Sequence, residues 1–185
     1  MILAVDVHYD PQNTWARTGG LVFRDWAASE AVAEFVTTLD DVSPYESGAF
    51  YKRELPCILP VVQHVLSRFS IETIVVDGFV DLAQGAPGLG QHLHTRLERE
   101  IEVIGVAKNE FEGAPATAIT RGISRNPLWI SSTVDHAAAA ARVASMVGQA
   151  RIPLLLKRTD ALARGTVSPI DEAPEPGGNC GNSKD

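Results

Sequence analysis

The sequence predicts an α/β protein with a mixed β-sheet that is flanked by helices on both faces. Segments of strand length come first, and helical and strand patterns then alternate up to about residue 150. Two later segments, 71–78 and 101–109, are almost continuously apolar, as expected for strands that are buried on both faces of a sheet. This order indicates an antiparallel start followed by strands that are joined through helices.

The first elements are predicted to be strands. Residues 1–9 form an apolar strand pattern, and residues 18–26 form a second, alternating one. The loop between them contains Pro11, so we expect a hairpin. Residues 31–42 fit a third strand, although their apolar spacing also fits a helix.

Helices are predicted between the later strands. Residues 56–69 carry apolar side chains on one helical face after a polar loop at 43–55, and residues 91–100 follow a glycine-rich loop. A strand at 127–133 leads into a helix over 134–150, for which Thr133 is the expected N-cap and Gly148 the stop signal. We expect one domain over residues 1–165 and a disordered acidic tail over 166–185.

Composition narrows the class of protein. The 185 residues fit one domain, and no apolar run reaches the ~20 residues that span a bilayer, so we expect no membrane association. No signal-peptide pattern opens the chain, and Cys57 and Cys180 form no disulfide framework. We therefore expect a cytoplasmic protein with reduced thiols, and a monomer.

The formal net charge of −7 argues against a general nucleic-acid-binding surface, which is usually basic. The last twenty residues hold four acids and one lysine, so the rest of the chain carries −4. Any contact with nucleic acid therefore needs a local basic patch, together with metal cations that offset the carboxylates of the site.

Two aspartates occupy equivalent positions in two strand patterns. Asp6 follows ILAV and Asp77 follows TIVV, so the two carboxylates lie close together if the strands are neighbours. Such a pair repels itself unless a cation or a shared proton intervenes, and oxygen ligands favour Mg²⁺ or Mn²⁺. Glu54, at the expected start of a helix, is a candidate third ligand. The alternative is that each aspartate only accepts hydrogen bonds from turn amides.

Whole motifs in the chain resemble those of the endonuclease V family, which nicks nucleic acid near deoxyinosine or inosine. ILAVDVHY resembles the first strand of the family, and PYESGAFYKRE is similar to P-Y-x-P-G-x-L-x-F-R-E. VVDGFVDLAQGAPGLGQHL resembles V-D-G-x-G-x-x-H-P-R-x-x-G-x-A-S-H, and VIGVAKNEF is similar to I-G-V-A-K-S. PLWIS and RIPLLLKRTDALAR also resemble family segments, so the likeness covers nearly all of the first 165 residues in order.

The resemblance implies a ribonuclease H-like fold and a metal-dependent endonuclease of DNA repair that leaves a 3′-hydroxyl and a 5′-phosphate. It implies that Asp6, Glu54 and Asp77 bind Mg²⁺ or Mn²⁺, and that Lys108 lies near the substrate phosphate. The implied substrate is DNA, with RNA as an alternative, that carries a deaminated or damaged base. The residues implied to contact that substrate are Tyr45, Gly48, Arg53, Gly78 and Gly88, and His136 is the candidate for the family's catalytic histidine.

Several positions depart from the family pattern. The H-P-R triplet falls on residues 83–85, which are Ala, Gln and Gly, and Val80 replaces a glycine. Glu46 and Ser47 follow Tyr45 in the segment that wedges into the duplex in the family, and His136 is two residues past the direct match at Val134. These changes predict a divergent enzyme with altered base recognition. Two alternatives remain open, namely a non-catalytic nucleic-acid (inosine) binding module and a protein-interaction domain that retains the fold.

Overall fold

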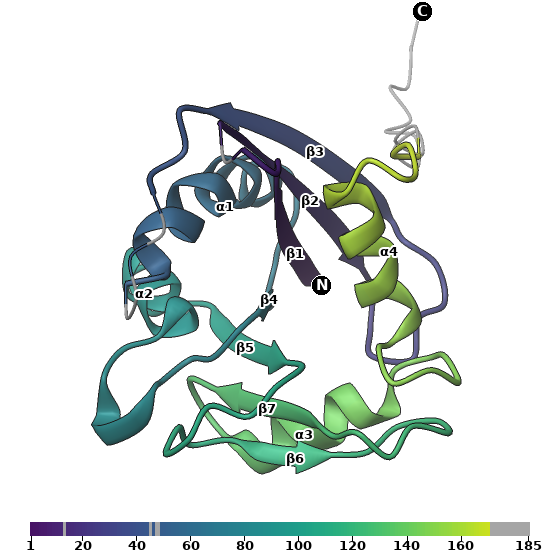
Figure 1. Ribbon diagram of the computed structural model, residues 1–185. Coiled ribbons are helices and arrows are strands. Elements are labelled where there is room, and N and C mark those ends of the chain that lie inside the picture. Colours follow the sequence, from purple (N-terminus) through teal and green to yellow (C-terminus); the bar gives the residue numbers. More distant parts are fainter. Residues whose placement is uncertain (13, 45, 47–48, 171–185) are drawn as a thin grey trace, which may run out of the picture.

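The computed structural model describes residues 1–12, 14–44, 46 and 49–170. Within this part of the chain, one seven-stranded sheet has the order β3-β2-β1-β4-β5-β7-β6 (Figure 1). β1, β4 and β5 run parallel to one another, whereas β2, β3, β7 and β6 join by antiparallel pairing. The predicted mixed sheet is therefore confirmed. The strands are β1 (Ile2–Tyr9), β2 (Trp15–Phe23), β3 (Ala33–Asp40), β4 (Thr73–Asp77), β5 (Glu102–Ala107), β6 (Thr117–Ile119) and β7 (Leu128–Ser132).

The first three strands form an antiparallel meander. β1 and β2 make the predicted hairpin, and the Asp10 carboxylate orders its turn by accepting hydrogen bonds from the backbone N–H groups of Gln12, Thr14 and Trp15. The segment that fitted either a strand or a helix is the strand β3, which pairs with β2 from Ala33 to Asp40. The backbone N–H and C=O groups of β3 form hydrogen bonds with β2, and this pairing favours a strand over a helix.

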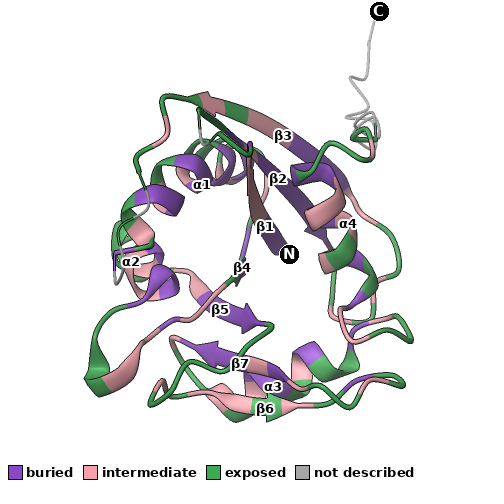
Figure 2. Ribbon diagram, viewed as in Figure 1, coloured by how far each residue is buried: buried purple, intermediate pink, exposed green. Residues whose placement is uncertain are grey.

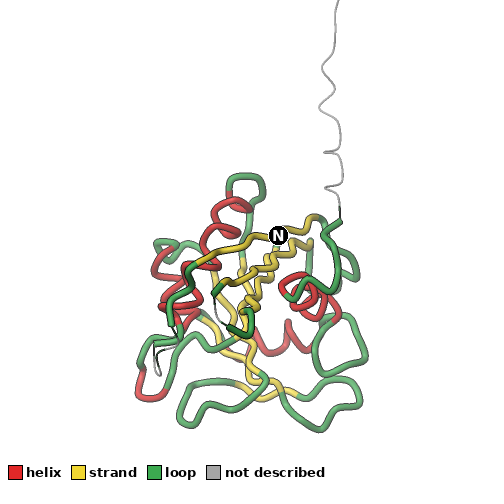
Figure 3. The backbone as a smooth tube through the Cα atoms, turned by 45° about the horizontal axis from the view of Figure 1, so that its top comes forward, coloured by secondary structure: helices red, strands yellow, loops and turns green. Residues whose placement is uncertain are grey.

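The helices cover both faces of the sheet, as predicted. They are α1 (Tyr51–Leu66), α2 (Leu89–Arg96), α3 (His136–Ser145) and α4 (Leu154–Ala163), with a short 3-10 turn, η1 (Ala83–Gly85). α1 and α2 pack on one face through a buried cluster that includes Leu3, Val61 and Leu93. α3 and α4 pack on the other face through Phe23, Val143 and Leu162. Figure 2 shows these buried bands along the strands and helices, and Figure 3 shows helices on either side of the sheet.

Three helix boundaries differ from the sequence prediction. α1 begins at Tyr51, one and a half turns before Pro56, so both of its prolines lie inside the helix and not in its first turn. α2 begins at Leu89 and ends at Arg96. The N-cap of α3 is Asp135, whose carboxylate accepts hydrogen bonds from two backbone N–H groups at 2.8 and 3.0 Å. Thr133 was therefore the wrong cap, because Asp135 directly precedes the helix and can reach these donors.

Two elements were not predicted at all. β6 has only three residues and pairs with β7 at the end of the sheet. α4 follows the segment RIP and lies against β1 and β2 (Figure 1). Its close approach requires a glycine below it, because a Cβ atom on Gly19 would lie 2.7 Å from the carbonyl oxygen of Thr159 and 2.8 Å from the amide nitrogen of Ala163.

The segment after α4 remains attached to the sheet as far as the structure describes it. The Arg158 guanidinium forms an ion pair with the buried Glu34 carboxylate and also donates a hydrogen bond to the carbonyl of Ser168. The backbone N–H of Ile170 donates to the same carboxylate at 2.9 Å. Ser168 and Ile170, in the first part of the expected tail, therefore make these contacts, and residues 171–185 lie outside the described residues.

Candidate functional site

The ends of β1 and β4 bring two aspartates together. The strands are parallel neighbours, with Val5 opposite Val76, and Asp6 and Asp77 are the next residue of each strand. Both side chains line two cavities, one on the α1 face of the sheet and one on the α4 face. The strand pairing that the sequence analysis required is therefore present, and the two carboxylates occupy the carboxyl edge of the parallel strands, where α/β sheets commonly bind ligands.

Glu54 reaches the same place from the first turn of α1. Its side chain lines a cavity of about 340 Å³ together with Asp6, Asp77, Gly78 and Phe50. Glu54 is only 6% exposed. The early start of α1 at Tyr51 is what turns this residue inward, because it places Glu54 on the same helical face as the buried Ile58 and Val61.

Asp6 and Glu54 lie in an unfavourable electrostatic environment. Burial and, after it, the charge of Asp77 together raise the pKa of Asp6 to about 7. Burial also raises the pKa of Glu54 to about 8, with added contributions from the charges of Asp6 and Asp77. Carboxylates that are buried together in this way favour either a proton or a bound cation. The site therefore has the character of a cation site.

The donor set fits Mg²⁺ or Mn²⁺. Both ions prefer carboxylate oxygens, and Mg²⁺ is commonly held by one or two carboxylates together with water and substrate phosphates. Within the described residues, no group of three His, Cys, Asp or Glu side chains forms a ready-made metal cage. The site therefore offers a carboxylate pair that phosphate oxygens and water can complete, and not a closed structural metal site.

Lys108 lies beside this pair, at the residue that follows β5. Its Nζ atom donates a hydrogen bond to Oδ2 of Asp77 at 2.8 Å, and both side chains are about two-fifths exposed. Burial lowers the pKa of Lys108, but the hydrogen bond and charge of Asp77 outweigh that effect, so the pKa is raised. The ammonium group is therefore charged and positioned at the mouth of the site.

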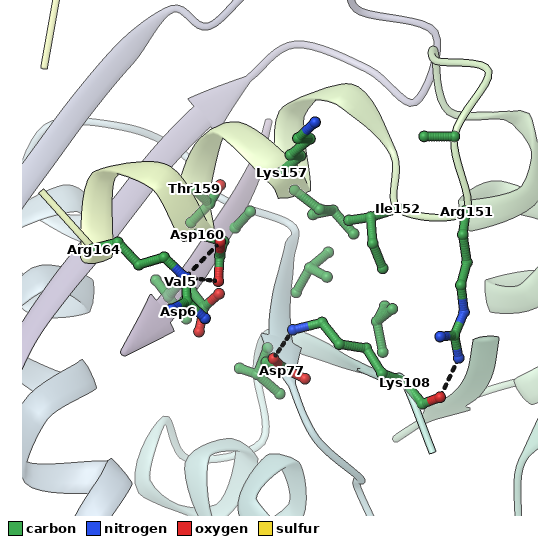
Figure 4. Close-up of a pocket in the computed structure, with 16 residues that line it drawn as sticks. Val5, Asp6, Asp77, Lys108, Arg151, Ile152, Lys157, Thr159, Asp160 and Arg164 are labelled. Carbon is green, nitrogen blue, oxygen red and sulfur yellow. Dashed lines mark hydrogen bonds and ion pairs between the residues drawn. The ribbon is translucent and has the colours of Figure 1, made fainter. Parts of the chain in front are cut away.

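Two residues of α4 that no sequence motif indicated also line the site. Asp160 and Arg164 share a cavity with Asp6, Asp77 and Lys108, and the charge of Asp160 raises the pKa of Asp6 (Figure 4). Arg164 Nε donates to both carboxylate oxygens of Asp160, at 3.0 and 2.9 Å. The spacing of these two residues predicts only an ion pair on one face of a helix, so the sequence carried no signal that Asp160 lies at the site.

Arg53 and Gly88 are placed for structural tasks. The Arg53 guanidinium is buried and lies over the Tyr9 ring, with Cζ 3.5 Å from the ring centroid. Gly88 precedes α2, and a Cβ atom there would lie 2.6 Å from the Phe79 carbonyl oxygen. Neither residue lines the two cavities beside the aspartates. Arg53 therefore packs on Tyr9 and Gly88 allows α2 to approach Phe79 closely, and their contact with substrate stays a prediction.

Gly78 lines the cavity on the α1 face together with Asp6 and Asp77. Its φ of +144° is a conformation that other residues rarely adopt. Val80, which replaces a family glycine, does not close the cavity. Its side chain is fully buried under α2, against Gly90. Tyr45 and Gly48, the other two residues expected to contact substrate, lie outside the described residues.

His136 is not brought to the site. It begins α3, just after β7, and β7 runs antiparallel to β5. Ser132 at the end of β7 pairs with Ile104 near the start of β5, whereas Lys108 follows the other end of β5. His136 therefore lies at the edge of the sheet opposite Asp6, Asp77 and Lys108. His92 instead stacks on the Tyr51 ring, with ring centroids 3.5 Å apart.

The family model of endonuclease V matches residues 1–148. The chain belongs to the endonuclease V family. This membership confirms the resemblance on which the sequence analysis relied, and it places the chain among nucleases. A search of curated proteins found no match.

Solved endonuclease V structures share the fold. One of these structures is the D234N form of the Ciona intestinalis enzyme, in complex with a 23mer DNA containing an inosine followed by a ribo-adenosine. Its TM-score is 0.76 at 17% sequence identity, and the match covers 89% of this chain and 84% of that chain. Endonuclease V of Streptomyces avermitilis has a TM-score of 0.70 at 24% identity, covering 89% and 80%. The human enzyme has a TM-score of 0.71 at 21% identity, covering 89% and 83%. The predicted fold class is confirmed by these similarities.

Proposed function

We propose that this endonuclease V homologue is a divalent-metal-dependent endonuclease that hydrolyses a phosphodiester bond near deoxyinosine or another altered base in DNA. The observation that carries the proposal is the placement of Asp6 and Asp77 on adjacent parallel strands, with Glu54 and Lys108 beside them. The DNA-bound Ciona enzyme, which has the same fold, supports the choice of substrate.

Each residue of the site has a separate task in this proposal. The Asp6 and Asp77 carboxylates hold Mg²⁺ or Mn²⁺, and the Glu54 carboxylate contributes from the α1 side. When bound, such ions activate water for attack and stabilise the departing 3′-oxygen. The Lys108 ammonium binds a non-bridging oxygen of the phosphate, and this places the phosphorus in line for attack. The products are a 3′-hydroxyl and a 5′-phosphate.

Asp160 and Arg164 complete the α4 side of the site. Asp160 adds a third carboxylate to the cavity on the α4 face, beside Asp6 and Asp77, and lies within electrostatic reach of Asp6. Arg164 holds that carboxylate in place through two hydrogen bonds. We assign Asp160 a supporting role, in which its carboxylate would accept hydrogen bonds from water beside a bound ion.

The selectivity for the altered base is proposed to differ from the family pattern. The family's H-P-R triplet is replaced by η1, where Gln84 has a φ of +60° and offers no charge to a nucleic acid. Cleavage rates on single strands with deoxyinosine, a mismatch, an abasic site or no modification measure this change. Strong and exclusive preference for deoxyinosine would contradict it.

A non-catalytic binding module is the competing proposal, and the site disfavours it. Buried carboxylates repel a polyanion and lower the affinity of a simple binder, unless cations offset their charge. The test is cleavage of a deoxyinosine oligonucleotide with Mg²⁺ or Mn²⁺, and binding of the same oligonucleotide in EDTA. Cleavage with metal supports the endonuclease, whereas binding in EDTA without any cleavage supports the module.

A further inference from the structure

A second cavity lies on the α4 face of the sheet and opens beside the proposed metal site. Its volume is about 490 Å³, within the range of small-molecule sites. Its inner walls are aliphatic, and they come from the strands β1, β4 and β5 below and from the segment leading into α4 above. The residues that define it are Val5, Val75, Val106, Ile152 and Leu156. We refer to it as the α4 cavity.

Charged side chains surround the mouth of the α4 cavity. Lys108, Arg151, Lys157 and Arg164 supply cations, and Asp6, Asp77 and Asp160 supply carboxylates (Figure 4). A divalent cation on the carboxylates would leave the mouth positively charged. An apolar interior behind a positive mouth is complementary to an apolar group that is joined to an anion.

The α4 cavity lies directly beside the position proposed for the cleaved phosphate. Asp6 and Asp77 line the α4 cavity and the cavity on the α1 face alike, so they lie on the ridge between the two. A phosphate that is held on this ridge by Lys108 has its two neighbouring nucleosides on either side. One of them then faces the α4 cavity.

We propose that the α4 cavity binds the base of a nucleotide adjacent to the cleaved phosphate, unstacked from the rest of the strand. Ile152 and Leu156 on one side and Val75 and Val106 on the other are apolar surfaces between which a flat base can lie. This base is distinct from the altered base that the enzyme selects. The inference rests on the proposed nuclease function, because that function places the phosphate on the ridge.

The walls of the cavity offer little with which to tell one base from another. The Thr159 hydroxyl already donates to the Leu155 carbonyl at 2.9 Å, and Nη2 of Arg151 donates to the carbonyls of Lys108 and Pro127, while Nε of Arg151 is buried without a hydrogen-bond partner among the described residues. Recognition is therefore by apolar contact, which tolerates any base. The presence of a base in the cavity therefore increases affinity for the strand, whereas the identity of that base does not.

Two substitutions on α4 form a matched test. Leu156→Trp fills the cavity from its upper wall, whereas Leu154→Trp places the same side chain two residues earlier, on an exposed position outside the cavity. Thermal unfolding of both variants shows whether they fold. The substrates are fluorescent single strands with one deoxyinosine, either intact or with an abasic nucleotide at one of the positions flanking the cleaved bond.

For the wild type, we expect one flanking position at which the abasic nucleotide raises KM about tenfold, the size of effect that loss of one stacked base has. Leu156→Trp raises KM on the intact strand by a similar factor with little change in kcat, and the abasic nucleotide causes no further loss. Leu154→Trp behaves like the wild type. Exchange of the base at that position among the four natural bases changes KM by less than about threefold, since apolar stacking is sequence-tolerant.

The inference is overturned if Leu156→Trp cleaves the intact strand with the KM of the wild type, or if no abasic position raises KM. Binding of the same strands with Ca²⁺, followed by fluorescence anisotropy, separates this failure from failure of the proposed function. If the wild type binds the strands but does not cut them, the same comparisons are made on Kd. If it neither binds nor cuts, both the proposed function and the inference are wrong.

Discussion

Lys108 and Asp77 form an ion pair of 2.8 Å between the ends of two adjacent parallel strands. The ammonium group therefore occupies one carboxylate oxygen that a metal ion would also use. An ion that binds Oδ2 of Asp77 would displace Lys108 and free the lysine to contact a phosphate. The pair thus couples metal binding to substrate binding in the proposed mechanism.

Replacement of Lys108 by methionine is expected to separate these two effects. Cleavage falls by about a hundredfold, the size of effect seen when one donor to a developing charge is removed. Affinity for Mn²⁺ does not fall, because the competing ammonium group is gone. Cleavage kinetics and calorimetric titration with Mn²⁺ measure the two quantities. Lys52→Met, which removes an exposed lysine paired with Glu46, is the control and should change neither.

The raised pKa of Asp6 makes a prediction about stability without metal. The folded protein keeps this proton up to a pH of about 7, whereas the unfolded chain releases it near pH 4. The folded state therefore binds more protons in this window, and stability falls as the pH rises through it. Asp6→Asn should reduce that fall, to which the raised pKa of Glu54 also contributes, and should raise Tm at pH 8 in EDTA. A gain of 1 kcal/mol corresponds to ~2–4 °C for a chain of this size.

Thermal unfolding at pH 5 and pH 8 in EDTA checks this prediction. The two proteins should differ more at pH 8 than at pH 5. Glu72→Gln is the control, because the side chain of Glu72 is 85% exposed and its substitution should leave Tm unchanged at both values. A lower Tm for Asp6→Asn at pH 8 would show that the Asp6 carboxylate stabilises the metal-free fold.

Metal binding should depend on pH in the opposite sense. Protons compete with the ion for Asp6 and Glu54, whose pKa values are about 7 and 8. The apparent affinity for Mn²⁺ should therefore increase as the pH rises from 6 to 8, and protons should be released on binding. Titration of the metal-free protein in buffers of different ionisation enthalpy measures both. An affinity that is independent of pH over this range would contradict the assignment of these two residues as ligands.

The contact of α4 with β2 gives a prediction about the Asp160 carboxylate. Gly19→Ala places a methyl group against backbone atoms of α4, which cannot move away as a flexible side chain could. Overpacking of this kind typically costs ~1–3 kcal/mol. We expect a lower Tm, and we also expect lower kcat because the shifted helix carries Asp160 away from Asp6. Unfolding and cleavage assays measure the two effects, and an unchanged kcat would remove Asp160 from the proposed mechanism.

The site residues that the sequence predicted share one property, which is that each lies at the end of a strand with a recognisable apolar pattern. Asp6 and Asp77 end two similar apolar strands, and Lys108 follows a third, so the sheet alone brings them to one edge. The position of Asp160 depends on α4, which is distant from these strands in the sequence and packs closely on β2 at Gly19. No local pattern around Asp160 shows that contact.

His136 and the start of α1 are two positions at which the local sequence pattern gave the wrong expectation. The sequence distance between His136 and the strand before it suggested a small shift, but the antiparallel direction of β7 decides which edge the histidine reaches. For α1, the two prolines suggested a start at Pro56, whereas the helix begins at Tyr51 and includes both. Packing of the helix against the sheet outweighs the backbone hydrogen bonds that proline removes.

The most direct test of the account is cleavage of a single-stranded oligonucleotide with one deoxyinosine, in Mg²⁺ or Mn²⁺, by the wild type, Asp6→Asn and Asp77→Asn. The account predicts specific nicking by the wild type and a loss of at least about a hundredfold in both variants, because each removes a charged ligand of the ion. Wild-type nicking that persists in either variant would contradict the claim that the two aspartates hold the catalytic metal.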